Sequence, residues 1–462
     1  MPTTSATATA ERTGVVLFTC DLRVHDNAAL AAAAARCERV VPLFVLDEEI
    51  LAGSCASANR LAFLRDCLAD LDGSLRDRGA GLVVRRGDLV AETLRVASRH
   101  GASSIDMSAD CTPYAARRRE RLARACAEQR VELREHAGPS VVAPGEVTPS
   151  DGGHYRIFTP YWRAWSGRVL QPAAPTPRRL SAPADLPELR LPAIPARDGT
   201  APSPRIARGG EGPARERLTR WLGGGLAGYE EGHDDLAGER TSRLSAFLHF
   251  GCLSPRTVLE RARGRPGAEG FARQLCWRDF HRQVLADRPE LPSRDYRPRG
   301  DRWRRSKRDL RAWREGLTGY PIVDAGMRQL AAEGFMHNRA RLIVASFLTK
   351  TLYVDWRAGA AHFASLLLDA DVANNVGNWQ WMAGTGNDTR PNRVLNPLRQ
   401  AERFDPDGAY VRRHVPELAG VRGRAVREPW RLPAAERRLL DYPAPIVDHE
   451  RAARELRGRR ER

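Results

Sequence analysis

Side chains that could do chemistry are concentrated in one stretch near the C-terminal end, residues 369–381, which reads DADVANNVGNWQW. Its thirteen residues include two carboxylates, three asparagines and two indoles, and no proline. The apolar run 363–368 leads into the stretch, so these polar groups are expected to enter a core rather than a solvated face. Buried carboxylates and amides need hydrogen-bond partners. The stretch therefore predicts a site for a ligand that is polar and also compatible with aromatic surfaces.

Three tryptophans, Trp303, Trp356 and Trp379, indicate a second kind of chemistry. Trp356 and Trp379 bracket the segment that leads into residues 369–381. An indole can be oxidised to a radical cation, so a file of indoles from a buried redox centre to the surface would conduct electrons. Packing of large aromatic side chains in an ordinary core is the alternative, and the spacing alone favours it.

The run TSRLS at 241–245 places hydroxyls at the start of an expected apolar helix. Hydroxyls there can cap the helix, and the free backbone N–H groups favour an anion. The run could therefore hold the pyrophosphate of a cofactor. A simple capped helix is the alternative, which the run by itself favours.

Basic residues outnumber acidic ones, with 74 Lys plus Arg against 57 Asp plus Glu and a formal net charge of +17. This excess favours a polyanionic partner, nucleic acid first, although compositional drift toward Arg and Ala explains it equally well. Residues 297–314 hold eight arginines. Phosphate contact by such residues makes binding salt-dependent, and a solvated helix face is the alternative for any one of them. Trp277 and Trp381 could stack on a base removed from a duplex.

Chemistry by side chains alone has little support in the sequence. There is no nucleophile elbow, P-loop or helicase-like motif, and the eleven histidines and eight cysteines show neither metal-ligand spacing nor a C-x-x-C pair. We therefore expect no metal and no disulfide framework, and infer a cofactor that carries the difficult step. The scattered cysteines, the lack of a secretory signal and the lack of an apolar run of roughly 18 residues predict a cytoplasmic protein without a membrane span.

Periodicity predicts an N-terminal domain at 14–137 in which short apolar strands alternate with helices. This alternation is typical of an α/β domain with a parallel, Rossmann-like sheet. The expected strands are 14–20, 40–46, 81–85 and 104–107, and the expected helices are 27–37, 60–75 and 89–99. No G-x-G-x-x-G follows the first strand, so the pattern does not establish a dinucleotide site.

The chain changes character after residue 137. Residues 138–215 are rich in proline and predict a long connector over the surface, ordered only around the aromatic run 154–165. Residues 216–445 have helical periodicity and predict an all-α domain. Its clearest helices are expected at 322–332, 338–353 and 358–368. Finally, residues 1–13 are expected to be a disordered leader and 446–462 a short charged tail.

Seven motifs in order along the chain resemble those of the photolyase/cryptochrome family, most closely the microbial class I cyclobutane pyrimidine dimer photolyases of the deazaflavin-antenna type. They are DLRVHDNAAL at 21–30, TSRLS at 241–245, WRDF at 277–280, GYPIVDAGMRQL at 319–330, MHNRAR at 336–341, DADVANNVGNWQW at 369–381 and NPLRQAERFDPDGAYVRRHVPEL at 396–418. The resemblance implies an antenna domain followed by a helical domain that holds FAD in a folded shape. Reduced FAD, excited by near-UV or blue light, would pass an electron to a flipped-out dimer in UV-damaged DNA and recover it after the ring opens. The protein is expected to act as a monomer.

The resemblance also assigns FAD contacts by position. Asp369 is expected to pair with Arg341 beside the isoalloxazine ring, and Asp371 to bind near it. Asn375 matches the asparagine that faces flavin N5. A side-chain amide there can hydrogen-bond N5 in both of its protonation states. The remaining FAD contacts are expected at Tyr229, Thr241, Ser242, Arg243, Leu244, Ser245 and Arg278.

Electron transfer and DNA binding are assigned in the same way. Trp379, Trp356 and Trp303, from the flavin outward, match the family's photoreduction chain. Lesion and DNA contacts are expected at Trp277, Met336, Asn338, Arg339, Trp381 and Gln400.

Two positions depart from the family's pattern. Gln274 stands in the lesion pocket where bacterial dimer photolyases usually have Glu. It can hydrogen-bond thymine but cannot stabilise a developing charge in the same way, which bears on repair efficiency and lesion type. His233 stands where the family has a DNA-contacting Arg, so phosphate binding is expected to be weaker or pH-dependent near neutrality.

The segment FVLDEEIL at 44–51 is more similar to deazaflavin-binding members than to folate-binding ones. Asp47 and Arg60 are then expected to contact 8-hydroxy-5-deazaflavin, with 5,10-methenyltetrahydrofolate as the alternative antenna.

Two other activities are compatible with the resemblance. A (6-4) photolyase would share Gln at position 274. It would also be expected to have histidines in the MHNR region, and Asn338 in that run argues against it. A cryptochrome photoreceptor would signal without repairing DNA. The residues after Pro445 offer it no signalling tail, and Asn375 favours a repair-type flavin environment.

Overall fold

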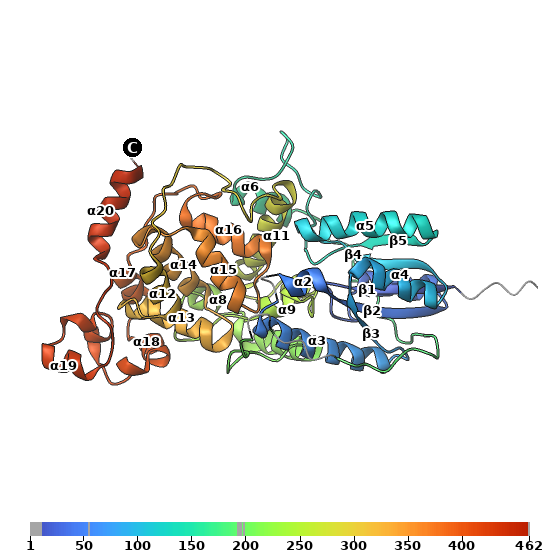
Figure 1. The fold of residues 1–462 in the computed structure, drawn as a ribbon, viewed down its shortest axis with the longest axis horizontal. Coiled ribbons are helices and arrows are strands. Elements are labelled where there is room, and N and C mark those ends of the chain that lie inside the picture. Colours follow the sequence, from blue (N-terminus) through green and yellow to red (C-terminus); the bar gives the residue numbers. More distant parts are fainter. Residues whose placement is uncertain (1–11, 54–55, 192–195, 197–198, 461–462) are drawn as a thin grey trace, which may run out of the picture.

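The computed structural model describes residues 12–53, 56–191, 196 and 199–460. Its N-terminal part is built on five parallel strands in the order β3-β2-β1-β4-β5 (Figure 1). The strands are β1 (Thr13–Phe18), β2 (Arg39–Asp47), β3 (Val83–Gly87), β4 (Ala102–Ser108) and β5 (Glu132–His136). The α/β class and the parallel sheet predicted from the sequence are confirmed.

Helices cover both faces of this sheet, which explains why its central strands are apolar on both faces. The helices of this part are α1 (Ala28–Arg36), α2 (Glu48–Ala52), α3 (Ala58–Arg76), α4 (Leu89–Arg99) and α5 (Pro113–Gln129). In β1, Val15 and Leu17 enter a core cluster with residues of α4 and α5, whereas Val16 and Phe18 enter the cluster that continues into the helical part. Alternate strand residues point to opposite faces, so one face of the sheet shares its core with the helical part.

Three elements of this part, α2, α5 and β5, were not predicted from the sequence. Strand β5 reads ELREH, lies at the sheet edge and buries none of its residues. Charged side chains on an edge strand deter pairing with another chain. Such a strand therefore lacks the apolar run by which the other strands were found.

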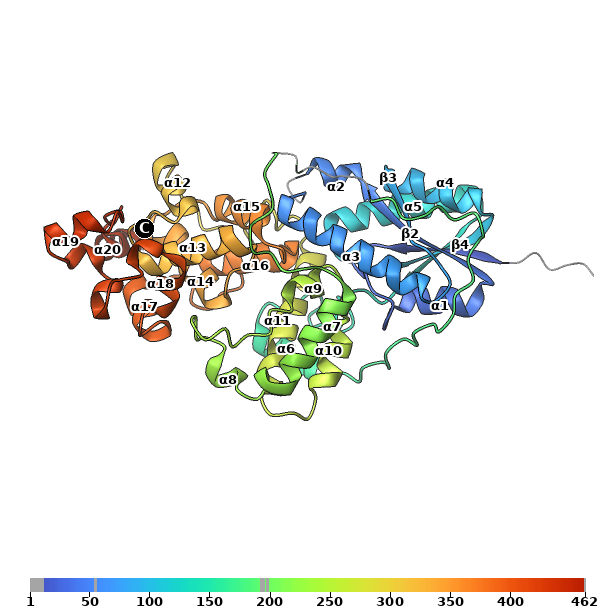
Figure 2. The same cartoon turned by 90° about the horizontal axis from the view of Figure 1, so that it is seen from below.

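The second half of the chain is helical in the part that the structure describes (Figure 2). Its helices are α7 (Glu211–Arg220), α8 (Tyr229–Gly232), α9 (Ser245–His249), α10 (Pro255–Ala262), α11 (Ala268–Asp287), α12 (Lys307–Glu315), α13 (Pro321–Glu333), α14 (Asn338–Ser346), α15 (Trp356–Leu366), α16 (Val372–Ala383), α17 (Pro397–Phe404), α18 (Ala409–His414), α19 (Ala434–Leu439) and α20 (His449–Arg460). Short π or 3-10 segments are η1 (Trp221–Gly225), η2 (Phe347–Thr351), η3 (Pro416–Leu418), η4 (Gly423–Val426) and η5 (Pro429–Arg431). The predicted all-α class is confirmed, and the three clearest predicted helices correspond to α13, α14 with η2, and α15.

The connector is not entirely a surface segment. Its aromatic run forms α6 (Phe158–Ser166), which packs against α11, and Phe158, Tyr161 and Trp165 are buried. Trp165 donates from Nε1 to Asp279 Oδ2 at 2.9 Å. The expectation of a surface location is therefore wrong for this run, because its rings complete the core around α11.

Polar contacts join the α/β part to the helical part. Arg23 donates from Nη1 to Gly251 O at 2.9 Å, and Val24 N donates to a carboxylate oxygen of Glu211 at 2.8 Å. Arg60 donates from Nη1 to Leu367 O at 2.9 Å. This last contact lies directly before residues 369–381, so the α/β part helps to position that stretch.

The segment expected to be a charged tail contains α20, which packs against η2 at one end of the molecule (Figure 1). Ala452 and Leu456 anchor it in the protein. Residues 461–462 of that segment, and 1–11 of the expected leader, lie outside the described ranges. Within those ranges, no helix is long and apolar enough to cross a membrane.

Candidate functional site

Helix α16 carries most of the stretch 369–381. Asp371 caps its start by accepting a hydrogen bond from Asn374 N at 2.9 Å. Gly384 follows its end with φ 80°, a conformation that glycine adopts without strain. Residues three and four apart share a helix face, so Asn375 and Trp379 point in the same direction.

That face lines a pocket between α14, α15 and α16, which we call the inner pocket. It is lined by Asn338, Arg341, Leu342, Ala345, Phe363, Leu367, Asp369, Asn374, Asn375, Asn378, Trp379 and Met382. Residues predicted from the sequence to bind a flavin, to contact a lesion and to donate electrons thus come together in one place.

The ion pair expected between Arg341 and Asp369 is present in this pocket. Arg341 donates from Nη2 to Asp369 Oδ2 at 2.9 Å and from Nε to Met336 O at 2.8 Å. Burial would raise the pKa of Asp369, but Arg341 outweighs it, so the pKa lies below its usual value and the carboxylate stays ionised. Oδ1 of Asp369 is buried and has no hydrogen-bond partner among the residues that the structure describes. A buried acceptor of this kind is usually satisfied by a ligand or by an ordered water.

A second buried charge cluster surrounds Asp371. Arg282 contacts Asp371 Oδ2 from Nη1 at 3.2 Å and also pairs with Asp110, which follows β4. Burial raises the pKa of Asp371, but Arg282 and Arg278 together lower it well below its usual range. Asp371 is therefore a helix cap and ion-pair partner rather than a pocket-lining side chain. Sequence reasoning missed Arg282, although its position four residues after Arg278 puts both on one face of α11.

Of the tryptophans of the expected electron chain, the two inner ones are buried and the outermost is not. Trp379 and Trp356 are buried, whereas Trp303 is partly exposed. A methyl group at Gly359 would lie 2.2 Å from Cη2 of Trp379. Gly359 and Trp356 are three residues apart on α15 and share a face, so the two buried indoles lie against the same side of that helix. Trp313 also contacts Trp379, with ring centroids 6.0 Å apart, and was not singled out by the sequence.

A second pocket of about 340 Å³, the outer pocket, adjoins the inner one. It is lined by Arg339, Leu342, Lys350, Trp381, Met382, Asp388, Thr389, Arg390, Arg393 and Leu395. Leu342 and Met382 line both pockets. Burial lowers the pKa of Lys350 to about 7, and its ammonium donates to Pro391 O at 2.9 Å. The outer pocket is therefore a basic, aromatic site separated from the inner pocket by two apolar side chains.

Trp381 belongs to an aromatic group beside the outer pocket. Its ring is perpendicular to that of Trp277 at 5.3 Å between centroids. Trp277 is stacked on Phe158 of α6 at 3.7 Å. The predicted pair of base-stacking indoles is thus in contact, and the connector supplies a third ring that the sequence did not indicate as part of the site.

Comparison with known proteins places this arrangement in a family. A model described as DNA photolyase matches residues 14–179, and one described as FAD binding domain of DNA photolyase matches residues 271–462. A deoxyribodipyrimidine photo-lyase of Streptomyces griseus is 54% identical over 438 residues, which cover 94% of this chain and 96% of that relative. The chain belongs to the photolyase/cryptochrome family. The deoxyribodipyrimidine photo-lyase of Escherichia coli (strain K12) is 37% identical over 95% of this chain and 96% of its own length.

Solved structures agree with this family. A bacterial class III photolyase from Agrobacterium tumefaciens has a TM-score of 0.90 and 35% identity, covering 98% of both chains. A cryptochrome from Synechocystis sp. PCC6803 has a TM-score of 0.89 and 29% identity, covering 97% of this chain and 99% of its own. Assignment to class I within the family stays a prediction.

The residues that line the inner pocket are chemically suited to the FAD that the family model names. The unpartnered Oδ1 of Asp369 offers an acceptor to a ring N–H, and Asn375, whose Nδ2 donates to Ala360 O at 3.0 Å, is held against α15. Residues 241–244 of the run 241–245 form a loop, and α9 begins at Ser245, with Leu244 at the cap position and no side-chain hydrogen bond from that cap. The capped-helix interpretation of this run is therefore wrong.

Other expected FAD contacts have protein partners of their own. Arg243 forms an ion pair with Glu333 at 2.8 Å. Arg278 donates to Leu248 O at 3.3 Å and to Pro139 O. The ring of Tyr229 is buried. Their roles toward FAD stay predictions.

The expected lesion contacts differ in accessibility. Asn338 and Gln274 are exposed, whereas Met336 is fully buried and has no surface to offer a lesion in this structure. Gln400 has a buried Oε1 without a hydrogen-bond partner among the described residues, and its contact with a lesion stays a prediction.

Two basic positions are engaged within the protein. Arg339 pairs with both carboxylate oxygens of Asp234, at 3.0 and 2.6 Å, so its guanidinium is held rather than extended toward solvent. His233 lies with Nδ1 3.1 Å from Tyr229 O.

The expected antenna residues also have protein contacts. Asp47 caps α2 by accepting from Glu49 N at 2.9 Å and accepts from the hydroxyl of Tyr114. Arg60 binds backbone carbonyls at the end of α15, including Ala364 O at 2.5 Å. These contacts explain both residues structurally, and their antenna role stays a prediction.

Proposed function

We propose that this protein repairs cyclobutane pyrimidine dimers in UV-damaged DNA with light. The observation that carries this proposal is the adjacency of the two pockets: the Arg341–Asp369 pair and Asn375 line the inner one, and Trp381 and basic residues line the outer one. Only Leu342 and Met382 are common to both. Such proximity suits electron transfer from a cofactor to a substrate.

FAD supplies the chemistry when it is bound and reduced, because light excitation makes it a donor of the electron that opens the dimer and returns afterwards. The protein's part is to bind and orient. Arg341 keeps Asp369 ionised, and Asp369 presents Oδ1 to a donor on the ring. Asn375, held by Ala360 O, offers its amide to the N5 side. Apolar Leu342 and Met382 exclude water between the pockets.

The outer pocket suits a flipped-out dimer of bases. Arg390 and Arg393 at its rim are exposed and available to phosphates, which would make binding salt-dependent. Trp277 and Trp381 provide perpendicular aromatic surfaces for the bases. Gln274 precedes Trp277 by one turn of α11 and is exposed on the same side. We therefore keep it as the polar contact to the lesion.

Reduction of the cofactor would use Trp379, Trp356 and Trp303, in this order from the inner pocket outward. For the antenna we propose 8-hydroxy-5-deazaflavin, with 5,10-methenyltetrahydrofolate as the alternative. The absorption spectrum of the purified protein distinguishes the two chromophores.

A cryptochrome photoreceptor without repair activity is the second candidate, supported by the likeness to the Synechocystis cryptochrome. One experiment separates the candidates. Chemically reduced protein is mixed with oligonucleotides that carry either a cyclobutane dimer or a (6-4) product, under blue light or in the dark. Light-dependent loss of the dimer alone supports our proposal. Loss of the (6-4) product alone supports a (6-4) photolyase, and repair of neither supports the photoreceptor.

A further inference from the structure

A buried lysine, Lys350, is unusual in a chain whose basic residues are almost all arginines. Of the 74 Lys plus Arg in the sequence, only Lys307 and Lys350 are lysines. Lys307 is exposed at the start of α12, whereas Lys350 lies in η2 and is 1% exposed. Lysine is almost never fully buried unless it is paired. The surroundings of Lys350 therefore have to account for its burial.

The amine of Lys350 holds the loop 384–396, which connects α16 to α17. Its Nζ donates to Pro391 O at 2.9 Å and to Arg393 O at 2.6 Å. Lys350, Arg390 and Arg393 all line the outer pocket. The amine thus fixes the backbone that carries two arginines of the proposed DNA site.

Charged groups from three parts of the chain act on this amine. They are Arg460 of α20, Arg299 of the segment before α12, and Asp388 and Arg393 of the loop. Arg460 Nη1 donates to the same carbonyl oxygen as Lys350, Pro391 O, at 2.9 Å. Burial and the three guanidinium groups outweigh Asp388 and lower the pKa of Lys350 to about 7. Lys350 therefore changes its charge near neutral pH, which an arginine would not do.

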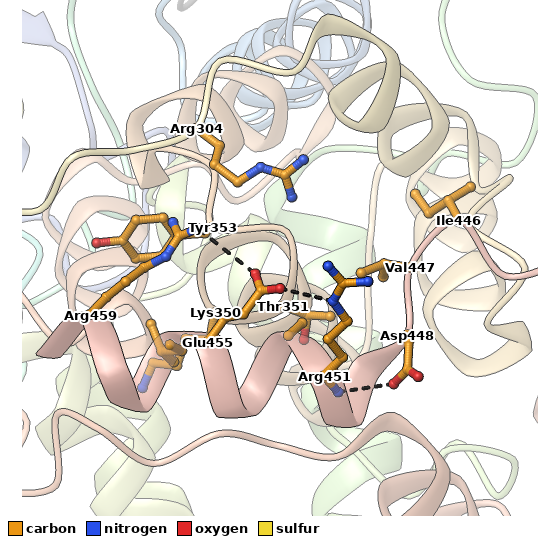
Figure 3. Close-up of a pocket in the computed structure, with 12 residues that line it drawn as sticks. Arg304, Lys350, Thr351, Tyr353, Ile446, Val447, Asp448, Arg451, Glu455 and Arg459 are labelled. Carbon is orange, nitrogen blue, oxygen red and sulfur yellow. Dashed lines mark hydrogen bonds and ion pairs between the residues drawn. The ribbon is translucent and has the colours of Figure 1, made fainter.

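Lys350 also lines a pocket of about 410 Å³ on the side of α20 (Figure 3). The other charged residues that line this pocket are Arg304, Asp448, Arg451, Glu455 and Arg459. Arg451 and Glu455 are exposed, so the pocket is in contact with solution. Because Lys350 lines both this pocket and the outer one, protons can reach its amine while DNA covers the outer pocket.

We propose that Lys350 is a positioning residue for DNA binding, which holds the loop that presents Arg390 and Arg393 to phosphates and takes up a proton when DNA binds. This inference rests on the proposed function, which brings phosphates to the outer pocket. A nearby phosphate favours the ammonium form over the neutral amine. Binding therefore converts Lys350–NH₂ to Lys350–NH₃⁺ with a proton from solution.

Proton uptake on binding decides the sign of the pH dependence. The pKa of Lys350 is about 7 without DNA, and DNA phosphates should raise it. The contribution of Lys350 to affinity is then fully present below the pKa of the free protein and is lost as pH rises through the pKa of the complex. One titrating group changes the affinity by at most about tenfold per pH unit.

The presence of only two lysines allows a direct test by NMR. FAD-loaded protein made with lysine that carries carbon-13 at Cε should give one resonance for each lysine, which is followed against pH without DNA and with a dimer-containing duplex in the dark. Lys307 is the internal control and should titrate with the ordinary pKa of about 10.4. Lys350 should titrate near neutral pH without DNA and at higher pH with DNA. An ordinary pKa for Lys350, or one that DNA leaves unchanged, overturns the proposal.

The pH profile of DNA affinity tests the same role by mutation. Fluorescence anisotropy at fixed salt compares the wild type with Lys350→Met from about pH 6 to about pH 8, a range that spans the pKa of Lys350. Wild-type affinity should fall across this range, and the fall should be smaller in Lys350→Met. His233 is present in both proteins, so its titration cancels in the comparison.

Lys307→Met is the matched control and should keep the wild-type profile, because it removes an exposed lysine outside the outer pocket. Parallel profiles of the wild type and Lys350→Met overturn the role of Lys350, even if the variant binds more weakly throughout. Should Lys350→Met fail to fold, the NMR titration alone decides.

A repair assay separates this inference from the proposed function. Light-driven repair by the chemically reduced wild type, together with parallel pH profiles, refutes the role of Lys350 alone. If the wild type neither binds dimer-containing DNA nor repairs it, the proposed function is refuted, and the role of Lys350 with it.

Discussion

Trp379 and Gly359 are in such close contact that no larger residue fits between the indole and helix α15. A methyl group at position 359 would lie 2.2 Å from Cη2 and 2.4 Å from Cζ3 of Trp379, and 2.7 Å from Cδ2 of Leu348. Because Trp379 also lines the inner pocket, this glycine sets the distance between α15 and the proposed first electron donor.

Gly359→Ala is expected to lower both stability and the rate of photoreduction. Overpacking a core costs about 1–3 kcal/mol, and the better helix propensity of alanine offsets about 1 kcal/mol of it. Urea unfolding and the rate of flavin reduction under blue light measure the two effects. The matched control is Gly73→Ala in helix α3. A methyl group there meets no described atom within 4 Å outside the helix's own backbone, so the substitution should be neutral or stabilising. Equal stability of the two variants would contradict the packing found at Trp379.

Trp356→Phe is expected to abolish photoreduction of oxidised FAD while leaving repair by chemically reduced protein intact. The substitution keeps an aromatic ring in a fully buried position but raises the barrier to electron loss. Trp313→Phe is the control, since Trp313 is also buried and contacts Trp379 but lies outside the proposed chain. If photoreduction depended on Trp313 and not on Trp356, the electron path would run through Trp313 instead of Trp356. Loss of repair by pre-reduced Trp356→Phe would show that this residue is not confined to photoreduction.

Arg282→Gln is expected to destabilise the protein by about 3–5 kcal/mol, the cost of leaving a buried partner charge uncompensated. Arg311→Gln removes an exposed pair with Glu315 and should cost at most about 0.5 kcal/mol. Urea unfolding of both variants at neutral pH makes the comparison. If both variants lost similar free energies of unfolding, the ion pairs around Asp371 would contribute no more to stability than an exposed ion pair does.

The depressed pKa of Asp371 also predicts a pH dependence. A carboxyl group whose pKa is lower in the folded protein stabilises it above the unfolded pKa of about 3.9. This contribution is lost as pH falls from there toward the folded pKa. The free energy of unfolding of the wild type should therefore decline below about pH 4. In Arg282→Gln the pKa of Asp371 should be less depressed, so the free energy of unfolding should decline less steeply as pH falls. An identical pH dependence in the wild type and the variant would argue against the Arg282–Asp371 ion pair.

The extent to which the sequence predicted the fold depended on whether burial left a periodic signal. Apolar runs such as that of β1 and helical spacing such as that of α13 predicted their elements. Strand β5 has no such run, because an edge strand of charged residues is not buried. The aromatic run of α6 was recognised as ordered but placed on the surface, because its burial depends on contacts with α11 that are remote in sequence.

The candidate site was predicted where residue type and local spacing define the geometry. Asp369, Asn375 and Trp379 lie on one short segment, and the resemblance supplied Arg341 as a partner. Other contacts between residues far apart in the sequence were not predicted, because local spacing does not define their geometry. Arg282 pairs with Asp110 and Asp371, which lie in two distant parts of the chain. Tyr353 packs against Trp303, with ring centroids 5.0 Å apart. Neither contact has a signature in local spacing.

Trp277→Ala is expected to weaken binding of dimer-containing DNA by about 1–3 kcal/mol, the contribution of an aromatic ring stacked on a base. Phe158 already covers one face of this indole at 3.7 Å, which holds the ring in place and leaves the side toward Trp381 for the lesion. Binding of undamaged DNA should change far less, because phosphate contacts by arginines such as Arg390 and Arg393 are retained. Fluorescence anisotropy with damaged and undamaged oligonucleotides measures both affinities. An equal loss of affinity for damaged and undamaged DNA would mean that Trp277 stabilises the DNA-binding face and does not contact the lesion.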